Sequence, residues 1–161
     1  MSDDPSSTPS GTYVPPDRTG RVLGLDIGAK RIGIAISDDT GVIASPVGFV
    51  GRGPKSLAEL RALIERYGAV RLIAGLPAGL SGREGPQAMD TRIYADALAT
   101  ALDLPLDYWD ERLTTTIAER SLIANGARRD KRREQIDSVA AAIMLQSYLD
   151  AKKNRRNRAG R

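Results

Sequence analysis

The stretch that decides the fold is Arg21-Val-Leu-Gly-Leu-Asp26-Ile-Gly28-Ala-Lys-Arg-Ile-Gly33-Ile-Ala-Ile-Ser37. It predicts two strands, at 21–27 and 31–38, joined by a tight turn. Because side chains alternate between the two faces of a strand, Asp26 shares a face with Val22 and Gly24, whereas leucine and isoleucine fill the opposite face. An ionised carboxylate taken out of water must be paired, hydrogen-bonded or bound to a metal. Asp26 therefore marks a candidate site.

The second strand sorts its side chains by size in the same way. Its isoleucines share one face, and the opposite face carries Gly33, Ala35 and Ser37. If the small-residue faces of the two strands line up, Asp26 lies in a shallow area with room above it.

The rest of the chain predicts an alternation of helices and strands. We expect strands at 42–50, 70–74 and 105–109, and helices at 56–67, 87–102, 115–125 and 134–151. An antiparallel meander followed by this alternation predicts an α/β fold, in which a mixed five-stranded sheet is flanked by helices. Sites in such sheets gather beyond the carboxyl ends of the parallel strands.

The domain organisation is simple, because 161 residues suit one compact domain. We expect that domain at 21–151. A disordered leader at 1–20, rich in Ser, Thr and Pro, precedes it, and a basic flexible tail at 152–161 follows it.

The amino-acid composition limits the chemistry, since the chain contains no Cys and no His. It can form neither disulfides nor thiolate metal sites, and it lacks the commonest general base. A metal ion would be held by oxygen ligands, which favours Mg²⁺ or Mn²⁺. No apolar run reaches the length of a membrane span, and no signal peptide is recognisable. We therefore expect a cytoplasmic protein that does not bind membranes.

Positive charge is concentrated at the end of the chain. Residues 1–127 carry 13 Lys/Arg and 16 Asp/Glu, a net charge of −3, whereas residues 128–161 carry 11 and 4, a net charge of +7. Such clusters contact polyanions such as nucleic acid. One cluster precedes the helix at 134–151, and cations at the start of a helix are unfavourable because they oppose the helix dipole. Their presence there favours a role in phosphate binding over that of a merely solvated surface. This basic cluster consists of Arg128, Arg129, Lys131, Arg132 and Arg133.

Three further acidic residues accompany Asp26. Asp110 and Glu111 directly follow the strand at 105–109, and Asp137 borders the apolar stripe of the last helix. Taken singly, each could be a solvated surface acid or an acid favoured by a helix start. Taken together, carboxylates on a strand, a strand end and a helix suit two-metal phosphoryl transfer, in which they hold two divalent ions about 4 Å apart.

Four motifs then occur in order: Leu25-Asp26-Ile-Gly28-Ala-Lys30-Arg31-Ile-Gly33, Gly75-Leu-Pro77, Asp110-Glu111-Arg112-Leu-Thr114-Thr115 and Ile136-Asp137-Ser-Val-Ala140-Ala141. With them, residues 21–150 resemble the YqgF family of Holliday-junction resolvases, also described as pre-16S ribosomal RNA nucleases. The resemblance implies a ribonuclease H-like fold, with an antiparallel meander followed by parallel strands.

The resemblance also implies roles for individual residues. Asp26, Glu111 and Asp137 match the catalytic, metal-binding acids, and Asp110 is a further candidate ligand. Contacts with substrate phosphates are expected from Lys30, Arg31 and Arg112. The implied activity is that of a metal-dependent nuclease, a hydrolase acting on ester bonds. Its expected role is 5′-end processing of pre-16S ribosomal RNA in ribosome biogenesis, or resolution of Holliday junctions in DNA recombination.

Two alternatives belong to other functional classes. A noncatalytic RNA-binding or ribosome-assembly factor could use the same fold, since fold does not determine activity; the complete set of acids argues against it. An ATP-binding protein of the actin and sugar-kinase type shares the Asp-x-Gly pattern, but one domain cannot supply its two lobes. Symmetric junction cleavage would need a two-fold homodimer, and no sequence feature establishes one.

Overall fold

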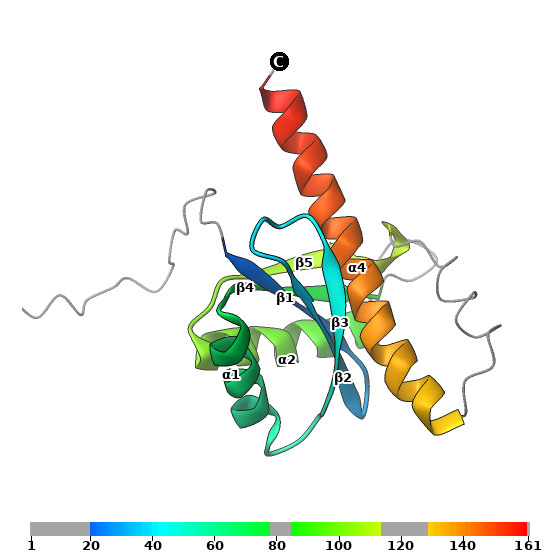
Figure 1. Cartoon of the computed structure of the whole chain (residues 1–161). Coiled ribbons are helices and arrows are strands. Elements are labelled where there is room, and N and C mark those ends of the chain that lie inside the picture. Colours follow the sequence, from blue (N-terminus) through cyan, green and yellow to red (C-terminus); the bar gives the residue numbers. More distant parts are fainter. Residues whose placement is uncertain (1–19, 78–84, 114–128, 161) are drawn as a thin grey trace, which may run out of the picture.

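A computed structural model of the protein describes residues 20–77, 85–113 and 129–160; for 129–137 it describes the backbone alone. Its centre is a five-stranded sheet with helices on both faces (Figure 1). The strands are β1 (Arg21–Ile27), β2 (Arg31–Ser37), β3 (Ala44–Gly51), β4 (Ala69–Leu76) and β5 (Leu106–Asp110). The helices are α1 (Ser56–Tyr67), α2 (Pro86–Leu102), the short 3₁₀ helix η1 (Glu111–Leu113) and α4 (Arg129–Ala159).

The strand order is β3-β2-β1-β4-β5. β1, β2 and β3 form an antiparallel meander, whereas β4 runs parallel to β1, and β5 runs parallel to β4. This arrangement confirms the mixed sheet that the sequence predicts. Since β1, β4 and β5 run in one direction, their carboxyl ends meet at the same edge of the sheet.

One face of the sheet is packed against α1 and α2. The isoleucines and leucines of β1 and β2 are buried on this face, together with the apolar stripes of the two helices. Helix α1 ends at Gly68, whose φ of 67° is the left-handed conformation that glycine adopts without steric cost. Its N–H donates to the Ile64 carbonyl and closes the last turn.

The opposite face carries the small residues and is covered by α4 (Figure 1). Gly24 of β1 pairs with Ala35 of β2, so the small-residue faces of the hairpin do line up, as predicted. A Cβ placed on Gly24 would lie 3.1 Å from the Cβ of Leu145, which leaves no space between helix and strand at this point. The buried cluster on this face consists of Val22, Ala35, Ile73, Trp109, Ala141, Met144, Leu145 and Leu149.

Helix α4 is longer than predicted at both ends. It begins at Arg129 rather than 134, and it continues to Ala159, so most of the segment expected to be a flexible tail is helical. The reason is local: 129–159 contains neither Gly nor Pro, and its Lys, Arg and Ala residues are good helix formers. Arg156 and Arg158 in the last turn also complement the negative end of the helix dipole.

Some predicted segments lie outside the described residues, namely almost all of the leader at 1–20 and the helix at 115–125. Where helices are described, none is both long enough and apolar enough to cross a membrane.

Candidate active site

The carboxyl ends of the parallel strands bring two of the predicted acids to one place. Leu25 of β1 pairs with Ala74 of β4, and continuing this register by one residue sets Asp26 beside Gly75. Gly75 in turn pairs with Trp109 of β5, which packs on the α4 face. Asp26 lies two residues after Gly24 and therefore shares that face. Asp26, Gly75 and Trp109 thus form one row across the sheet beneath α4.

Glu111 follows β5 and folds back over this row. A Cβ placed on Gly75 would lie 2.9 Å from Glu111 Oε1 and 3.2 Å from Glu111 Cγ. The Glu111 carboxylate therefore occupies the space that a side chain at position 75 would fill. Neighbouring strands are about 4.8 Å apart, so the carboxylate lies within about 8 Å of the Asp26 Cβ.

Glycine flanks Asp26 on both neighbouring strands. Gly33 of β2 pairs directly with Asp26, and Gly75 of β4 stands on its other side. Half-buried at the sheet edge, Asp26 consequently has no side chain beside it in its own row on β2 or β4.

The N-terminal half of helix α4 lies toward the same edge of the sheet. Val22 and Leu149 line one cavity, and Gly24 meets Leu145, so α4 runs antiparallel to β1. Two residues along a strand cover about the same distance as one turn of a helix. Counting from the contact between Gly24 and Leu145, Asp26 is two residues further along β1, and Ala141 is one turn earlier in α4, at about the same level. The backbone of Asp137 is one turn before Ala141 in α4, toward the carboxyl ends of the parallel strands. Its side chain is outside the described part.

Asp110 is placed differently from the other acids. Both of its carboxylate oxygens accept hydrogen bonds from Arg112, whose Nη2 lies 2.7 Å from Asp110 Oδ2, and the Arg112 backbone N–H donates at 2.9 Å. These bonds hold the pKa of Asp110 below its usual value. In the pleat, Asp110 falls on the face of Tyr108, opposite to Trp109.

The structure therefore argues against Asp110 as a metal ligand, and Arg112 is its ion-pair partner. The side chains that the structure describes include no group of three or more acids able to hold a metal ion. Asp26 and Glu111 lie together, Asp110 does not join them, and the predicted third acid, Asp137, is not among those side chains. The convergence of Asp26, Glu111 and Asp137 stays a prediction.

The hairpin between β1 and β2 places Lys30 and Arg31 at the same edge as Asp26. Its turn is closed by the Gly28 N–H, which donates to the Arg31 carbonyl at 2.8 Å. Lys30 is exposed, and the Arg31 guanidinium lies 5.6 Å from the centre of the Phe49 ring. Both cations can therefore approach a substrate backbone near the carboxylates. The basic cluster stays a prediction: Arg128 lies outside the described residues, and Arg129, Lys131, Arg132 and Arg133 are placed only as backbone in the first turns of α4.

Two residues of the site were missed by the sequence analysis. Gly75 appears in the sequence analysis only as part of a motif just after the strand expected at 70–74, although a glycine at the end of a parallel strand can signal a close approach by another group. Arg52 had no distinguishing sequence signal. Its Nη1 donates to the Gly28 carbonyl at 3.1 Å, both terminal nitrogens bind Asp90, and its guanidinium lies 4.2 Å from the centre of the Tyr94 ring. Arg52 thereby ties the β1–β2 turn to α2.

Comparisons with known proteins identify relatives of the whole domain. A family model described as RuvX, Holliday junction resolvase, matches residues 20–151. Two proteins named "Putative pre-16S rRNA nuclease" are close in sequence. The one from Heliobacterium modesticaldum is 42% identical over 134 residues, which are 82% of this chain and 90% of the relative. The one from Geobacillus kaustophilus is 44% identical over 137 residues, 83% and 99% of the two chains.

A solved structure shares the architecture. RuvC of T. thermophilus, determined in complex with a Holliday junction substrate, superposes with a TM-score of 0.52. The match covers 84% of this chain and 96% of RuvC at 14% identity, so it supports the fold alone, the ribonuclease H-like fold implied by the motifs. The family model and the relatives confirm the resemblance that the four motifs carry. The chain therefore belongs to the RuvX family of Holliday junction resolvases.

Proposed function

We propose that this protein is a divalent-metal-dependent nuclease that hydrolyses phosphodiester bonds, with precursor 16S ribosomal RNA as its substrate. The observation that carries the proposal is the seat of the Glu111 carboxylate over Gly75, in the same row as Asp26. The substrate class is supported by the names of relatives that are 42% and 44% identical over most of their length.

The described residues fit a divalent cation. Asp26 and Glu111 supply carboxylate oxygens, the ligands that Mg²⁺ and Mn²⁺ prefer, and glycine at position 75 leaves the space that the Glu111 carboxylate takes. We assign Asp26 and Glu111 as ligands and Asp137 as the third. When bound, divalent ions at such a site stabilise the charge that develops on the attacking and leaving oxygens.

The chain's own groups then have distinct tasks. Lys30 and Arg31 on the hairpin, with the basic cluster at the start of α4, hold the substrate backbone by its phosphates. Trp109 and the apolar residues of α4 pack together on the face of the sheet that carries Asp26. Hydrolysis breaks one P–O bond, adds a hydroxyl group to phosphorus and delivers a proton to the departing oxygen. The chain has no His and no Cys, and the carboxylates of Asp26 and Glu111 are the acidic groups placed to accept a proton at the site.

A four-way DNA junction is the second candidate substrate, favoured by the description of the family model. Cutting two strands symmetrically needs two copies of the site related by a two-fold axis. The junction alternative therefore predicts a dimer in solution, whereas cleavage of one RNA strand does not require one.

The test is a cleavage assay on two substrates, a pre-16S 5′ leader RNA and a four-way DNA junction. Each assay contains about 5 mM Mg²⁺ or Mn²⁺, which is above the dissociation constants of weak oxygen-ligand sites. We expect defined cuts in the RNA, loss of cleavage in EDTA, and loss of cleavage in Asp26→Asn. Cleavage of the junction alone would reassign the substrate. Binding without cleavage of either substrate would favour the noncatalytic RNA-binding factor and overturn the proposal.

A further inference from the structure

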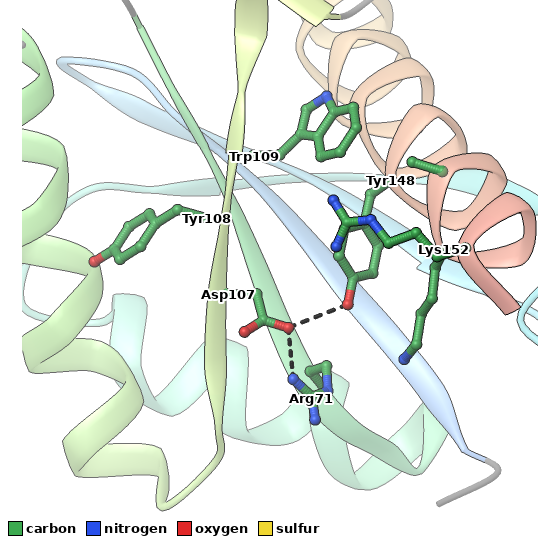
Figure 2. Close-up of a pocket in the computed structure, with 8 residues that line it drawn as sticks. Arg71, Asp107, Tyr108, Trp109, Tyr148 and Lys152 are labelled. Atoms are coloured by element: carbon green, nitrogen blue, oxygen red, sulfur yellow. Dashed lines mark hydrogen bonds and ion pairs between the residues drawn. The ribbon is translucent and has the colours of Figure 1, made fainter. Parts of the chain in front are cut away.

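A basic pocket lies beneath the C-terminal half of α4, where Arg71 near the start of β4 and Asp107 near the start of β5 line it (Figure 2). Its volume is about 420 Å³, and it opens at the edge strand β5. Charged groups from two strands and the helix line it: Arg71, Asp107, Lys152 and Arg155. Three cations face one carboxylate, so the pocket has an excess of positive charge.

The single carboxylate of this pocket is already engaged. Asp107 Oδ2 lies 2.5 Å from Arg71 Nη1 and accepts a hydrogen bond from the Tyr148 hydroxyl at 3.1 Å (Figure 2). Burial and the adjacent Asp107 raise the pKa of Tyr148 to about 12, so the hydroxyl keeps its proton at neutral pH. Asp107 therefore neutralises the charge of Arg71, and the positive charges of Lys152 and Arg155 are not neutralised by a carboxylate of the pocket.

Lys152 is held close to other cations. Its ammonium lies 5.9 Å from the centre of the Tyr148 ring, and it also lines a second cavity with Arg71, Lys153 and Arg156. Partial burial, followed by the charges of Arg71 and Arg156, lowers the pKa of Lys152. Within the described part of the chain, neither Lys152 nor Arg155 is in an ion pair. Mutual repulsion of this kind is relieved when an anion binds.

The pocket and the carboxylates are on the same face of the sheet. Arg71 and Gly75 are four residues apart on β4, which places them about 13 Å apart on the α4 side. A stacked nucleic-acid strand advances about 3.4 Å per nucleotide, so this distance corresponds to about four nucleotides. A single strand can thus pass over both sites along the β5 edge.

We propose that the basic pocket binds a backbone phosphate of the nucleic-acid substrate, about four nucleotides from the bond that is cut. The identity of this ligand as substrate rests on the proposed nuclease function; the anion site itself rests on the geometry of the pocket. This gives a role to the residues that the sequence analysis left in a flexible tail. Their helical conformation holds Lys152 and Arg155 over β4 and β5.

The test compares Lys152→Gln/Arg155→Gln with a control that loses the same charge elsewhere, Lys55→Gln/Arg66→Gln around α1. Binding of a 16-nucleotide single-stranded RNA is measured by fluorescence anisotropy without divalent ions, between 50 and 200 mM salt, a range in which phosphate contacts dominate. Each contact with a single strand contributes about 0.7 to the salt slope, so losing two lowers it by about 1.4 and weakens binding about 25-fold at 0.1 M salt. The control should change Kd by less than about 2-fold, because a surface charge remote from the backbone is screened.

A second measurement locates the phosphate that the pocket binds. RNAs carrying one neutral methylphosphonate at successive positions are bound by wild type and by the pocket variant. We expect one or two positions that weaken wild-type binding about 5-fold, as expected for one single-strand phosphate at 0.1 M salt, and have no effect on the variant. Equal Kd values for the pocket variant and the control would overturn the pocket proposal. So would the same sensitive positions in both proteins.

Failure of the pocket proposal is distinct from failure of the nuclease proposal. If wild type cuts RNA in Mn²⁺ and both double variants bind alike, only the pocket assignment is wrong. If wild type cuts no substrate but the pocket variant loses affinity and salt dependence, the pocket assignment stands and the nuclease function is wrong.

Discussion

Replacing Gly75 by Ala tests whether this glycine positions the Glu111 carboxylate. The added methyl carbon would lie 2.9 Å from Glu111 Oε1 and 3.2 Å from Glu111 Cγ, which is tighter than van der Waals contact. The carboxylate is the free end of a flexible side chain, so it can move away by a rotation and leave the strand in place. Misplacing a catalytic group by about 1 Å costs about 100-fold in rate.

We therefore expect Gly75→Ala to lower kcat for RNA cleavage about 100-fold. The free energy of unfolding should change by less than about 1 kcal/mol, since alanine restricts the unfolded chain and offsets the local crowding. The assay is single-turnover cleavage in Mn²⁺, with urea unfolding of the same preparation. Gly51→Ala, at the end of β3 with nothing within 4 Å of the added carbon, is the matched control and should cut at the wild-type rate.

The effect should also depend on Glu111. In a Glu111→Gln background, Gly75→Ala should cause no further loss of residual cleavage, because both changes act through one carboxylate. Equal kcat values for Gly75→Ala and Gly51→Ala would refute the reasoning. A further 100-fold loss in the Glu111→Gln background would show that Gly75 acts through some other group.

Four further predictions address other parts of the molecule. Asp26→Asn should end cleavage while keeping or raising Tm in EDTA, because it removes repulsion between neighbouring carboxylates; a lower Tm would mark Asp26 as structural. Arg52→Ala should lower the free energy of unfolding by about 1–2 kcal/mol, because it removes the hydrogen bond to the Gly28 carbonyl and the packing on the Tyr94 ring. Asp90→Asn should lower it less. Equal losses in the two variants on urea unfolding would contradict the importance of these two contacts. Asp38 accepts bonds from Thr40, Val42 and Ile43, which lower its pKa to about 2, so the stability it adds is present above pH 3.8 and is lost as the pH falls toward 2. Urea unfolding should therefore show a gap between wild type and Asp38→Asn at pH 6 that closes by pH 2, and a constant gap would contradict the assignment. Neutralising Arg128, Arg129, Arg132 and Arg133 should lower the magnitude of the salt slope of single-stranded RNA binding by about 0.7 for each phosphate that the variant no longer binds. An unchanged slope would mean that the cluster is a solvated surface.

The parts of the fold that depend on local periodicity were predictable. The hairpin alternates apolar and small residues with a period of two, and this assigned its two faces and the seat of Asp26 correctly. The bounds of α1, Ser56–Tyr67, follow from its leucine spacing. Both patterns indicate which side of the strand or helix is buried, and the structure confirms that these sides are buried.

Features that depend on contacts between distant segments were not predictable. The Gly and Pro content after residue 74 is typical of a loop, yet β4 continues to Leu76 because it pairs with β5 through Asp110. The return of Glu111 over Gly75 is a contact between residues 36 positions apart. The face on which Asp110 lies depends on the pleat at the end of β5, and no motif records it.

The end of the last helix was missed for a different reason. A run of Lys, Arg and Asn without apolar residues has no side to bury, so it was predicted as a flexible tail. The helix persists because it continues α4, whose earlier turns are already fixed against the sheet, and extending a formed helix costs little.

The central claim is that Asp26 and Glu111 hold one divalent cation between them, and Mn²⁺ titration by calorimetry tests it most directly. Wild type is compared with Asp26→Asn, with Glu111→Gln, and with Asp110→Asn, whose carboxylate is paired with Arg112 on the other face of the sheet. We predict at least about 10-fold weaker Mn²⁺ binding in each of the first two variants and wild-type binding in the third. Unchanged binding in Asp26→Asn or Glu111→Gln, or a comparable loss in Asp110→Asn, would contradict the account.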